Sequence, residues 1–341
     1  MKPFLFLLLL VCLLPTVGAQ TAAAESEERA LFKAGRYDEV IQKLSGLADA
    51  PRDPREVTYL MGMSWYYKRE YQRALIYLET VVNSGDEMPA DSALAREFLE
   101  CQQALGLSHY MLGQMAEAIP FLEQTVSRFP NNNELTYALG MACIQTRQPD
   151  KARRAFGQMF GVAPDSAAAH LLTAQMMIRV EMEDFADAEL KKALEKDPRL
   201  PQANYLLGQN AIYKGNYDEA IAMLEKELAI NPNNAMAYYK IGDVLTRQIK
   251  WDEAIVQLQK SVWLNPFYSG PYILLGKSYL KKKQHSNAEG MLRRAIQFDP
   301  NNKSAHYLLG QVYQQLGRAE EARREFELAE KLQGNLESPD K

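Results

Sequence analysis

Two neighbouring stretches of the chain carry nearly the same pattern of residues. Residues 216–234 read NYDEAIAMLEKELAINPNN, and residues 250–268 read KWDEAIVQLQKSVWLNPFY. Ala220 and Ala254 lie 34 residues apart, and Pro232 and Pro266 are separated by the same interval. A constant interval of this size indicates an array of stacked structural units rather than a globular domain.

The repeat extends over almost the whole chain. Its alanine position recurs at Val40, Ala74, Ala118, Ala152, Ala186, Ala220, Ala254, Ala288 and Ala322, at intervals of 34 residues except for one interval, before Ala118, that is ten residues longer. A glycine precedes most of these positions by twelve residues, and in the later copies a proline follows them by twelve. The pattern predicts nine copies near residues 21–54, 55–88, 99–132, 133–166, 167–200, 201–234, 235–268, 269–302 and 303–336, with an insertion at 89–98 and a tail at 337–341.

Each copy has the pattern of two helices joined by a turn. In residues 235–248 and again in 252–264, apolar side chains recur at helical spacing, as in amphipathic helices. The glycine and the alanine are predicted to lie where the two helices cross, and the proline is predicted to end the second helix because it lacks an N–H donor. A left-handed residue at the end of the first helix is predicted where glycine occurs in the turn. These turn glycines are Gly35, Gly113, Gly215 and Gly317.

The 34-residue unit, with its small residues and its proline, resembles the tetratricopeptide repeat. The resemblance covers residues 21–336 and implies an all-α fold, a right-handed superhelical solenoid of helix-turn-helix repeats. Departures are local: Glu28 and Ala174 replace the glycine of their copies, and Glu181 stands in a turn. Polar residues in the outer copies are expected, because the two ends of a solenoid face water.

The ten extra residues before the third copy are predicted to lengthen its first helix. Asp91 or Ser92 is the expected N-cap, and Phe98 and Leu99 continue the apolar face toward Gly106. The acidic loop in front of this helix is either a contact for a partner or a tolerated insertion.

The N-terminus has the pattern of a secretory signal peptide over residues 1–19. Lys2 precedes an apolar run that ends at Pro15, and small residues follow before Gln20. The run is too short to span a bilayer, so no transmembrane segment is expected in the mature chain. We therefore expect an exported protein, periplasmic or secreted.

Composition and motifs argue against catalysis and against nucleic acid as the main partner. The net charge is −4 and the pI is about 5.8, whereas a protein that neutralises phosphates normally has a basic face. The four histidines fall at framework positions of the repeat, and no pair has metal-ligand spacing. Cys101 and Cys143 are interpreted as small buried hydrophobic residues. No enzyme activity, cofactor or metal is expected.

The resemblance implies that the first helices line a concave groove with positions 2, 5, 9, 12 and 13 of each copy. Aromatic and amide side chains there suit a bound peptide. The position-five tyrosines have an alternative role, which is to pack against the next helix. The predicted groove residues are Tyr59, Met63, Tyr66, Tyr67, Tyr137, Met141, Tyr205, Gln209, Tyr213, Tyr239, Asp243, Arg247, Lys277, Lys281, Tyr307, Gln311 and Gln314.

These features predict a non-catalytic scaffold that binds a protein or peptide segment in its groove. The alternative is a structural subunit of an envelope or secretion complex, such as a membrane-associated one, that uses its convex face and ends. Carbohydrate binding is a third, weaker alternative, because tyrosines can stack on sugars but no pair of acids is placed to act on them.

Overall fold

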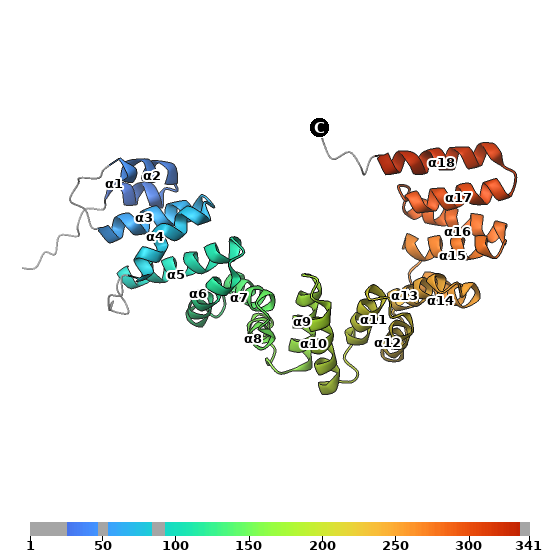
Figure 1. The fold of residues 1–341 in the computed structure, drawn as a ribbon, viewed down its shortest axis with the longest axis horizontal. Helices are drawn as coiled ribbons and strands as arrows, with labels where there is room; N and C mark the ends of the chain where they lie inside the picture. The colour runs from blue at the N-terminus through green and yellow to red at the C-terminus, as the bar shows by residue number, and fades with distance from the viewer. Residues whose placement is uncertain (1–25, 47–53, 84–92, 335–341) are drawn as a thin grey trace, which may run out of the picture. The chain divides into compact units, whose positions relative to one another are not determined.

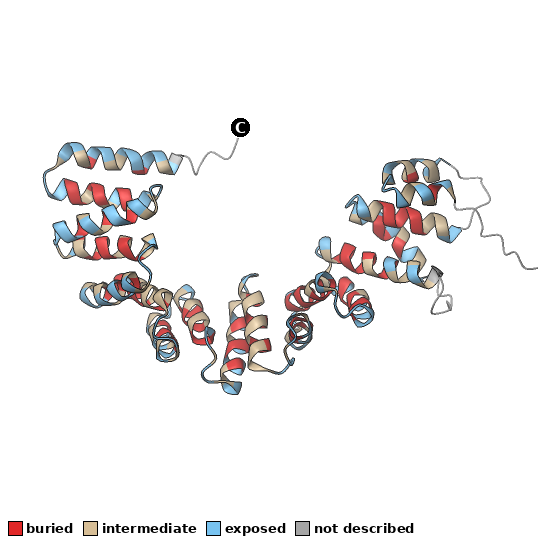
Figure 2. Ribbon diagram, turned by 180° about the vertical axis from the view of Figure 1, so that it is seen from behind, coloured by how far each residue is buried: buried red, intermediate tan, exposed pale blue. Residues whose placement is uncertain are grey.

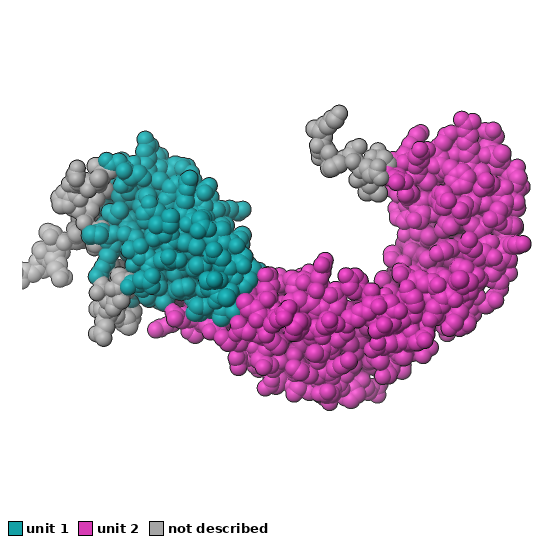
Figure 3. All heavy atoms as spheres, viewed as in Figure 1, with its two compact units in different colours: residues 1–121 teal, residues 122–341 magenta. Residues whose placement is uncertain are grey.

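The computed structural model describes residues 26–46, 54–83 and 93–334, and within these ranges every regular element is a helix (Figure 1). The predicted signal peptide, the predicted N-cap at Asp91 or Ser92 and the tail at 337–341 lie outside them. The described residues belong to two compact units, residues 1–121 and 122–341 (Figure 3).

Eighteen helices are described. Those that begin in the first unit are α1 (Glu27–Lys33), α2 (Tyr37–Ser45), α3 (Pro54–Tyr67), α4 (Tyr71–Asn83), α5 (Ala93–Met111) and α6 (Met115–Arg128). Those of the second unit are α7 (Asn133–Gln145), α8 (Pro149–Phe160), α9 (Ala167–Ile178), α10 (Glu183–Lys196), α11 (Ala203–Tyr213), α12 (Tyr217–Ile230), α13 (Ala235–Arg247), α14 (Trp251–Leu264), α15 (Ser269–Lys281), α16 (His285–Phe298), α17 (Lys303–Gln315) and α18 (Ala319–Gly334).

Within each unit, neighbouring helices pack in pairs, and these pairs pack on one another. In the second unit α13 packs on α14, α15 on α16 and α17 on α18, while α14 contacts α15 and α16 contacts α17. The first helices of successive pairs also touch, since α13 contacts α15 and α15 contacts α17. Buried residues form a stripe on each helix along these contacts (Figure 2). The fold is therefore the predicted all-α array of helix-turn-helix units.

In copies such as those of Gly242 and Gly276, the glycine of the repeat lies at the crossing of the two helices, and its nearest neighbour is the side chain four residues after the alanine. A Cβ on Gly242 would lie 2.5 Å from both Cγ and Cδ2 of Leu258, four residues after Ala254. Gly276 stands in the same relation to Leu292. The fully buried alanine is a core residue of the crossing, whereas the larger side chain at position 24 fills the space that the glycine leaves.

A left-handed residue, predicted for the turns that contain glycine, is present in every described turn between the helices of a pair. Its φ lies between 58° and 78° at Gly35, Arg69, Gly113, Arg147, Glu181, Gly215, Ile249, Lys283 and Gly317. The amide of the following residue returns to the first helix, as in the 2.9 Å bond that Lys250 N donates to Leu245 O. This bond closes a Schellman motif, which satisfies a carbonyl at the helix end.

The other local signals also act where they were expected. The second helices α12, α14 and α16 end two residues before Pro232, Pro266 and Pro300. The side chains of Asn234 and Asn302 accept hydrogen bonds from backbone amides of the next helix, as N-caps do. The first helix of the third copy, α5, has 19 residues, whereas α13, α15 and α17 have 13 each.

Candidate functional site

Three of the predicted groove residues lie in the core. Tyr59, Met63 and Met141 are at most 6% exposed. The hydroxyl of Tyr59 donates a 2.5 Å hydrogen bond to Glu100 Oε2 on α5, and burial together with this carboxylate raises its pKa. Tyr59 and Met63 on α3 lie against α5, and Met141 lies on α7, which packs on α8 and α9, so the prediction that these side chains offer contact surface is corrected.

The other aromatic residues predicted in the first unit contribute to a cluster of rings. Tyr67 is 50% exposed, and its ring stacks on Tyr37 with centroids 5.0 Å apart. Tyr66 is half-buried and meets Tyr71 edge-on at 6.1 Å. Phe32 lies 6.0 Å from Tyr67. This cluster joins α1, α2, α3 and α4, so it is chiefly a packing feature.

The position-five tyrosines of the second unit pack between helices. Tyr137, Tyr205 and Tyr239 are half-buried. The ring of Tyr239 meets that of Tyr268, the residue before α15, at 5.3 Å. Burial and the Tyr268 hydroxyl raise the pKa of Tyr239. These residues therefore take the packing role that the sequence left open as the alternative.

Polar groove residues stand on the exposed side of the first helices. Tyr213 is 76% exposed at the end of α11, and Arg247 and Lys281 are exposed at the same position of α13 and α15. Arg247 donates from Nε and Nη2 to the two carboxylate oxygens of Asp243, at 3.2 and 3.0 Å, and this contact raises its pKa. Gln209 and Lys277 are half-buried. These residues form a polar edge along neighbouring first helices.

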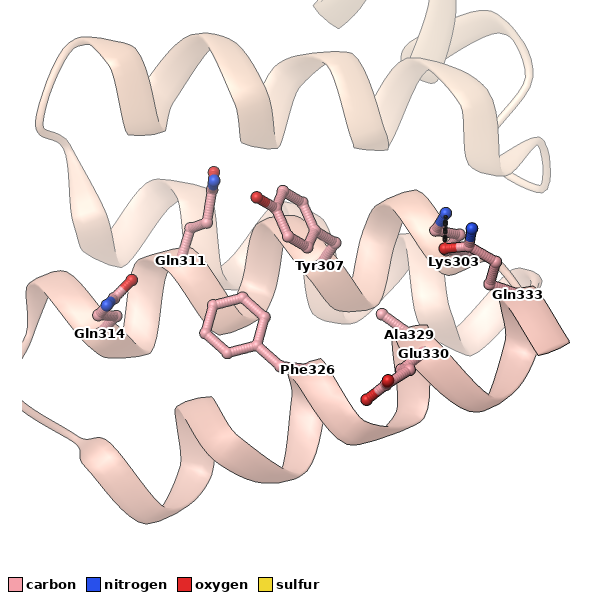
Figure 4. Close-up of a pocket in the computed structure, with 8 residues that line it drawn as sticks. All are labelled: Lys303, Tyr307, Gln311, Gln314, Phe326, Ala329, Glu330 and Gln333. Carbon is pink, nitrogen blue, oxygen red and sulfur yellow. Dashed lines mark hydrogen bonds between the residues drawn. The ribbon is translucent and has the colours of Figure 1, made fainter.

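Part of the predicted groove lies along α17 and α18. A cavity of about 580 Å³ opens there (Figure 4). Tyr307, Gln311 and Gln314, all predicted from the repeat position, line it from α17. We call this cavity the α17–α18 groove. Its residues are Lys303, Tyr307, Gln311, Gln314, Phe326, Ala329, Glu330 and Gln333.

Two aromatic rings form the apolar part of the α17–α18 groove. The centroids of Tyr307 and Phe326 are 5.6 Å apart, and Figure 4 shows both rings between the two helices. At one end Lys303 Nζ donates a 2.7 Å hydrogen bond to Gln333 Oε1. Glu330 forms no ion pair with any residue in the described ranges. The groove thus combines an apolar centre with amide and charged groups at its rim.

Tyr307 is more exposed than the tyrosine at the same position of an earlier copy. Tyr239 is covered by the start of the next pair, whereas Tyr307 at the same repeat position is 50% exposed. The rim is also more polar than in earlier copies. Position 28 is apolar in the five copies before the last, at Phe160, Leu194, Leu228, Val262 and Ile296, but is Glu330 in the last.

Sequence analysis missed the contribution of α18 to this site. Phe326, Glu330 and Gln333 are not among the groove residues predicted from the repeat position. The change from an apolar residue to a glutamate at position 28 was the available signal. A glutamate at this position gives the face a charged group where the five preceding copies have an apolar one.

The histidines at position four are framework residues, as predicted. His170 is 3% exposed and its Nδ1 lies 2.7 Å from Glu189 Oε2. His306 makes the same contact with Glu325 at 2.6 Å, and its Nε2 lies 2.9 Å from the carbonyl oxygen of Pro300. Both nitrogens of His306 are therefore engaged within the protein.

Glu189 lies at the centre of a buried ionic network. It is 2% exposed and accepts hydrogen bonds from Lys192 at 2.9 Å and from Arg153 at 3.4 Å. Burial acts to raise the pKa of Glu189, but the hydrogen bonds from Lys192 and His170 outweigh it and lower the pKa. Arg153 also bonds to acids of α8 and of the following loop. This network joins α8, α9 and α10.

Neither of the two cysteines in the described ranges is a reactive thiol. Cys101 and Cys143 are buried and free, and burial raises the pKa of both, that of Cys143 to about 11. Among the described residues no cluster of three or more histidine, cysteine or acidic residues could hold a metal ion. No helix in those ranges is long and apolar enough to cross a membrane.

Comparison with known proteins agrees with the helical pairs. Two family models, both described as tetratricopeptide repeat, match the chain: one at residues 109–176 and 279–336, the other at 205–262. The mouse Superkiller complex protein 3 is 33% identical over 101 residues, which are 29% of this chain and 6% of that protein.

Solved structures with similarity to this chain include MamA from Desulfovibrio magneticus RS-1, at 25% identity and a TM-score of 0.48 over 51% of this chain and 98% of that one. YrrB, described as a TPR protein with an unusual peptide-binding site, is 24% identical with a TM-score of 0.47, over 54% of this chain and 94% of that one. The two family models together match more than half of the residues. From the matched models and the paired helices, this chain belongs to the tetratricopeptide repeat family.

Proposed function

We propose that this protein is a non-catalytic scaffold that binds a segment of a partner protein, and that the α17–α18 groove is its anchoring site. The observation that carries the proposal is the open cavity of about 580 Å³ in which the rings of Tyr307 and Phe326 remain accessible. Apolar cavities with a few polar groups at their rim are the usual form of binding sites.

The chemistry of the groove suits a polypeptide. The two rings offer contact area for an apolar side chain at little cost in conformational entropy, as aromatic anchors do at interfaces. The amides of Gln311 and Gln314 can each donate to a backbone carbonyl and accept from a backbone N–H. Glu330 supplies a charge that favours a basic neighbour in the bound segment. The groove holds no pair of groups arranged for acid–base or nucleophilic chemistry.

We also propose that the scaffold acts in an exported compartment, periplasmic or secreted. The support is the apolar run and the small residues that precede Gln20. N-terminal sequencing of the mature protein should begin at or near Gln20. Recovery of the chain with its Met1 from the soluble cytoplasmic fraction would contradict export.

Site-specific photocrosslinking tests the binding site. A benzophenone amino acid at Gln314 should capture a partner in an extract of the native source, whereas the same probe at Glu253, an exposed residue of α14, should not. Adding Tyr307→Ala should reduce the crosslinked product about tenfold or more without changing the helical circular dichroism. Equal capture at the two probe positions, or capture that survives Tyr307→Ala, would refute the proposal.

An assembly role is the second candidate, because the open groove lies on the last described helical pair. Neighbouring pairs in this chain already bind one another through the same positions, as Tyr239 and Tyr268 show. In that role the protein is a subunit of an envelope or secretion complex. A crosslinked product of two copies of this chain, or of this chain with a membrane-associated subunit, would favour assembly over capture of a client segment.

A further inference from the structure

The second helices carry an aromatic surface that the architecture does not require. Trp263 at the end of α14 is 81% exposed, and Phe267 in the following turn is 78% exposed. They are the two most exposed large hydrophobic side chains among the described residues. Exposed aromatic side chains that lie together mark interaction sites more often than chance surface positions.

These two residues border a hollow of about 540 Å³ formed by α14, α15 and α16. Its floor includes Tyr272 and Leu275, which are 6% and 1% exposed. Phe298 forms a wall, with its ring 6.0 Å from Phe267 and 5.6 Å from Tyr272. We call this cavity the α14–α16 hollow. It also contains Gln259, Val262, Pro266, Tyr279, Met291 and Arg294.

The aromatic border is a departure from the repeat. At the position of Trp263, the copies before and after have Ala229 and Gln297, and at the position of Phe267 both have asparagine. Those neighbouring copies form the same helices and the same turns with these residues. The two rings are therefore dispensable for the fold, and leaving them in water is unfavourable.

The charge at the hollow is positive. Arg294 is exposed on α16, is the one charged residue that lines the hollow, and forms no ion pair with any residue that the structure describes. An acidic group that entered the hollow would find a cationic partner and no lining carboxylate.

We propose that the α14–α16 hollow binds a segment of a partner protein in which a large apolar side chain stands next to an acidic residue. The apolar side chain packs on Tyr272 and Leu275 between Trp263 and Phe267, and the carboxylate pairs with Arg294. Trp, Tyr and Arg are the residues that contribute most to binding at protein interfaces. This site is separate from the α17–α18 groove and does not rest on the function proposed for it.

A random twelve-residue peptide library displayed on phage tests the proposal, with the full chain as the immobilised target. The selection is subtracted against Trp263→Gln with Phe267→Asn, which installs the residues of the next copy and so preserves the helical pair. Recovered peptides should carry an aromatic or large aliphatic residue within two positions of Asp or Glu. A synthetic peptide of that sequence should bind the double variant about 30-fold more weakly than the wild type.

Two further variants test which groups bind the peptide. Arg294→Gln should weaken the same peptide about tenfold and reduce the dependence of Kd on salt, because the ion pair is lost. Tyr307→Ala should leave this Kd unchanged, which separates the hollow from the α17–α18 groove. Peptides without an acidic residue, a Kd equal in wild type and double variant, or no enrichment over the subtracted target would each overturn the proposal.

Discussion

Adding one methyl group at the crossing of α13 and α14 tests how the pairs are packed. In Gly242→Ala the new Cβ would lie 2.5 Å from Cγ and Cδ2 of Leu258, and the three nearest atoms all belong to that side chain. Carbon atoms in contact prefer about 3.5–4.0 Å. Because Cγ is not the flexible end of the side chain, the whole of Leu258 must move, and Leu258 is fully buried.

The expected cost follows from two opposing contributions. Overpacking of a core costs about 1–3 kcal/mol, and the two close contacts place this site at the upper end of that range. Alanine is favoured over glycine inside a helix by about 1 kcal/mol. We therefore expect Gly242→Ala to lower the free energy of unfolding by about 2 kcal/mol. Gly290→Ala is the matched control, since that exposed glycine in α16 has no atom within 4 Å of its added Cβ. It should stabilise by about 1 kcal/mol.

A double-mutant cycle identifies the cause. Leu258→Ala alone should cost about 2–5 kcal/mol by opening a cavity. In that background Gly242→Ala no longer meets Cγ, so it should cost nothing or stabilise by about 1 kcal/mol, which gives a coupling energy of about 2–3 kcal/mol between the two sites. Urea unfolding followed by circular dichroism measures all four proteins. Additive effects, or a Gly242→Ala protein as stable as the Gly290→Ala control, would refute this account of the crossing.

Three other outcomes are expected. Ile249→Gly should raise the urea midpoint, because Ile249 has φ 65° and a left-handed conformation costs a branched residue about 1–2 kcal/mol; an unchanged or lower midpoint would contradict this. The hydrogen bonds from Lys192 and His170 lower the pKa of Glu189, so the stabilisation they give is present above the ordinary pKa of 4.5 and is lost as the pH falls through the lower pKa of the folded protein. In Glu189→Gln the free energy of unfolding should therefore change less with pH in this range. A pH dependence identical to that of the wild type would show that the network does not stabilise the fold. Tyr239→Ala should lower stability by about 3 kcal/mol, as loss of a packed aromatic ring does, and thermal unfolding identical to wild type would show that this ring does not pack between helical pairs.

Local sequence signals predicted the helical pair and its turns. The left-handed residue recurs at position 15 whether the side chain is Gly215, Ile249 or Lys283. The 34-residue period locates the left-handed residue because neighbouring copies impose the same backbone path on each turn. Prolines ended the second helices and asparagines capped the first ones for local reasons, so one copy could be interpreted without the others.

Side-chain exposure needed the tertiary structure. Tyr59, Tyr239 and Tyr307 share position five, yet the first is in the core, the second is half-buried against Tyr268 and the third is exposed. The repeat position of a residue indicates the direction in which its side chain points from the helix, but not which neighbouring element covers that side chain. That depends on whether another helix follows and on how long that helix is, as α5 shows over Tyr59.

The period therefore determined the fold class, the helix boundaries and the residues that turn the chain, since each of these depends on contacts within one copy or with the next. The two cavities were decided only by the packed structure. The α17–α18 groove depends on side chains of both α17 and α18, and the α14–α16 hollow depends on rings from α14, the following turn and α16 meeting over α15. The repeat pattern is an average over the copies, so it does not include residues that differ in a single copy, such as Trp263 and Phe267. These single-copy residues form the border of the proposed binding surface.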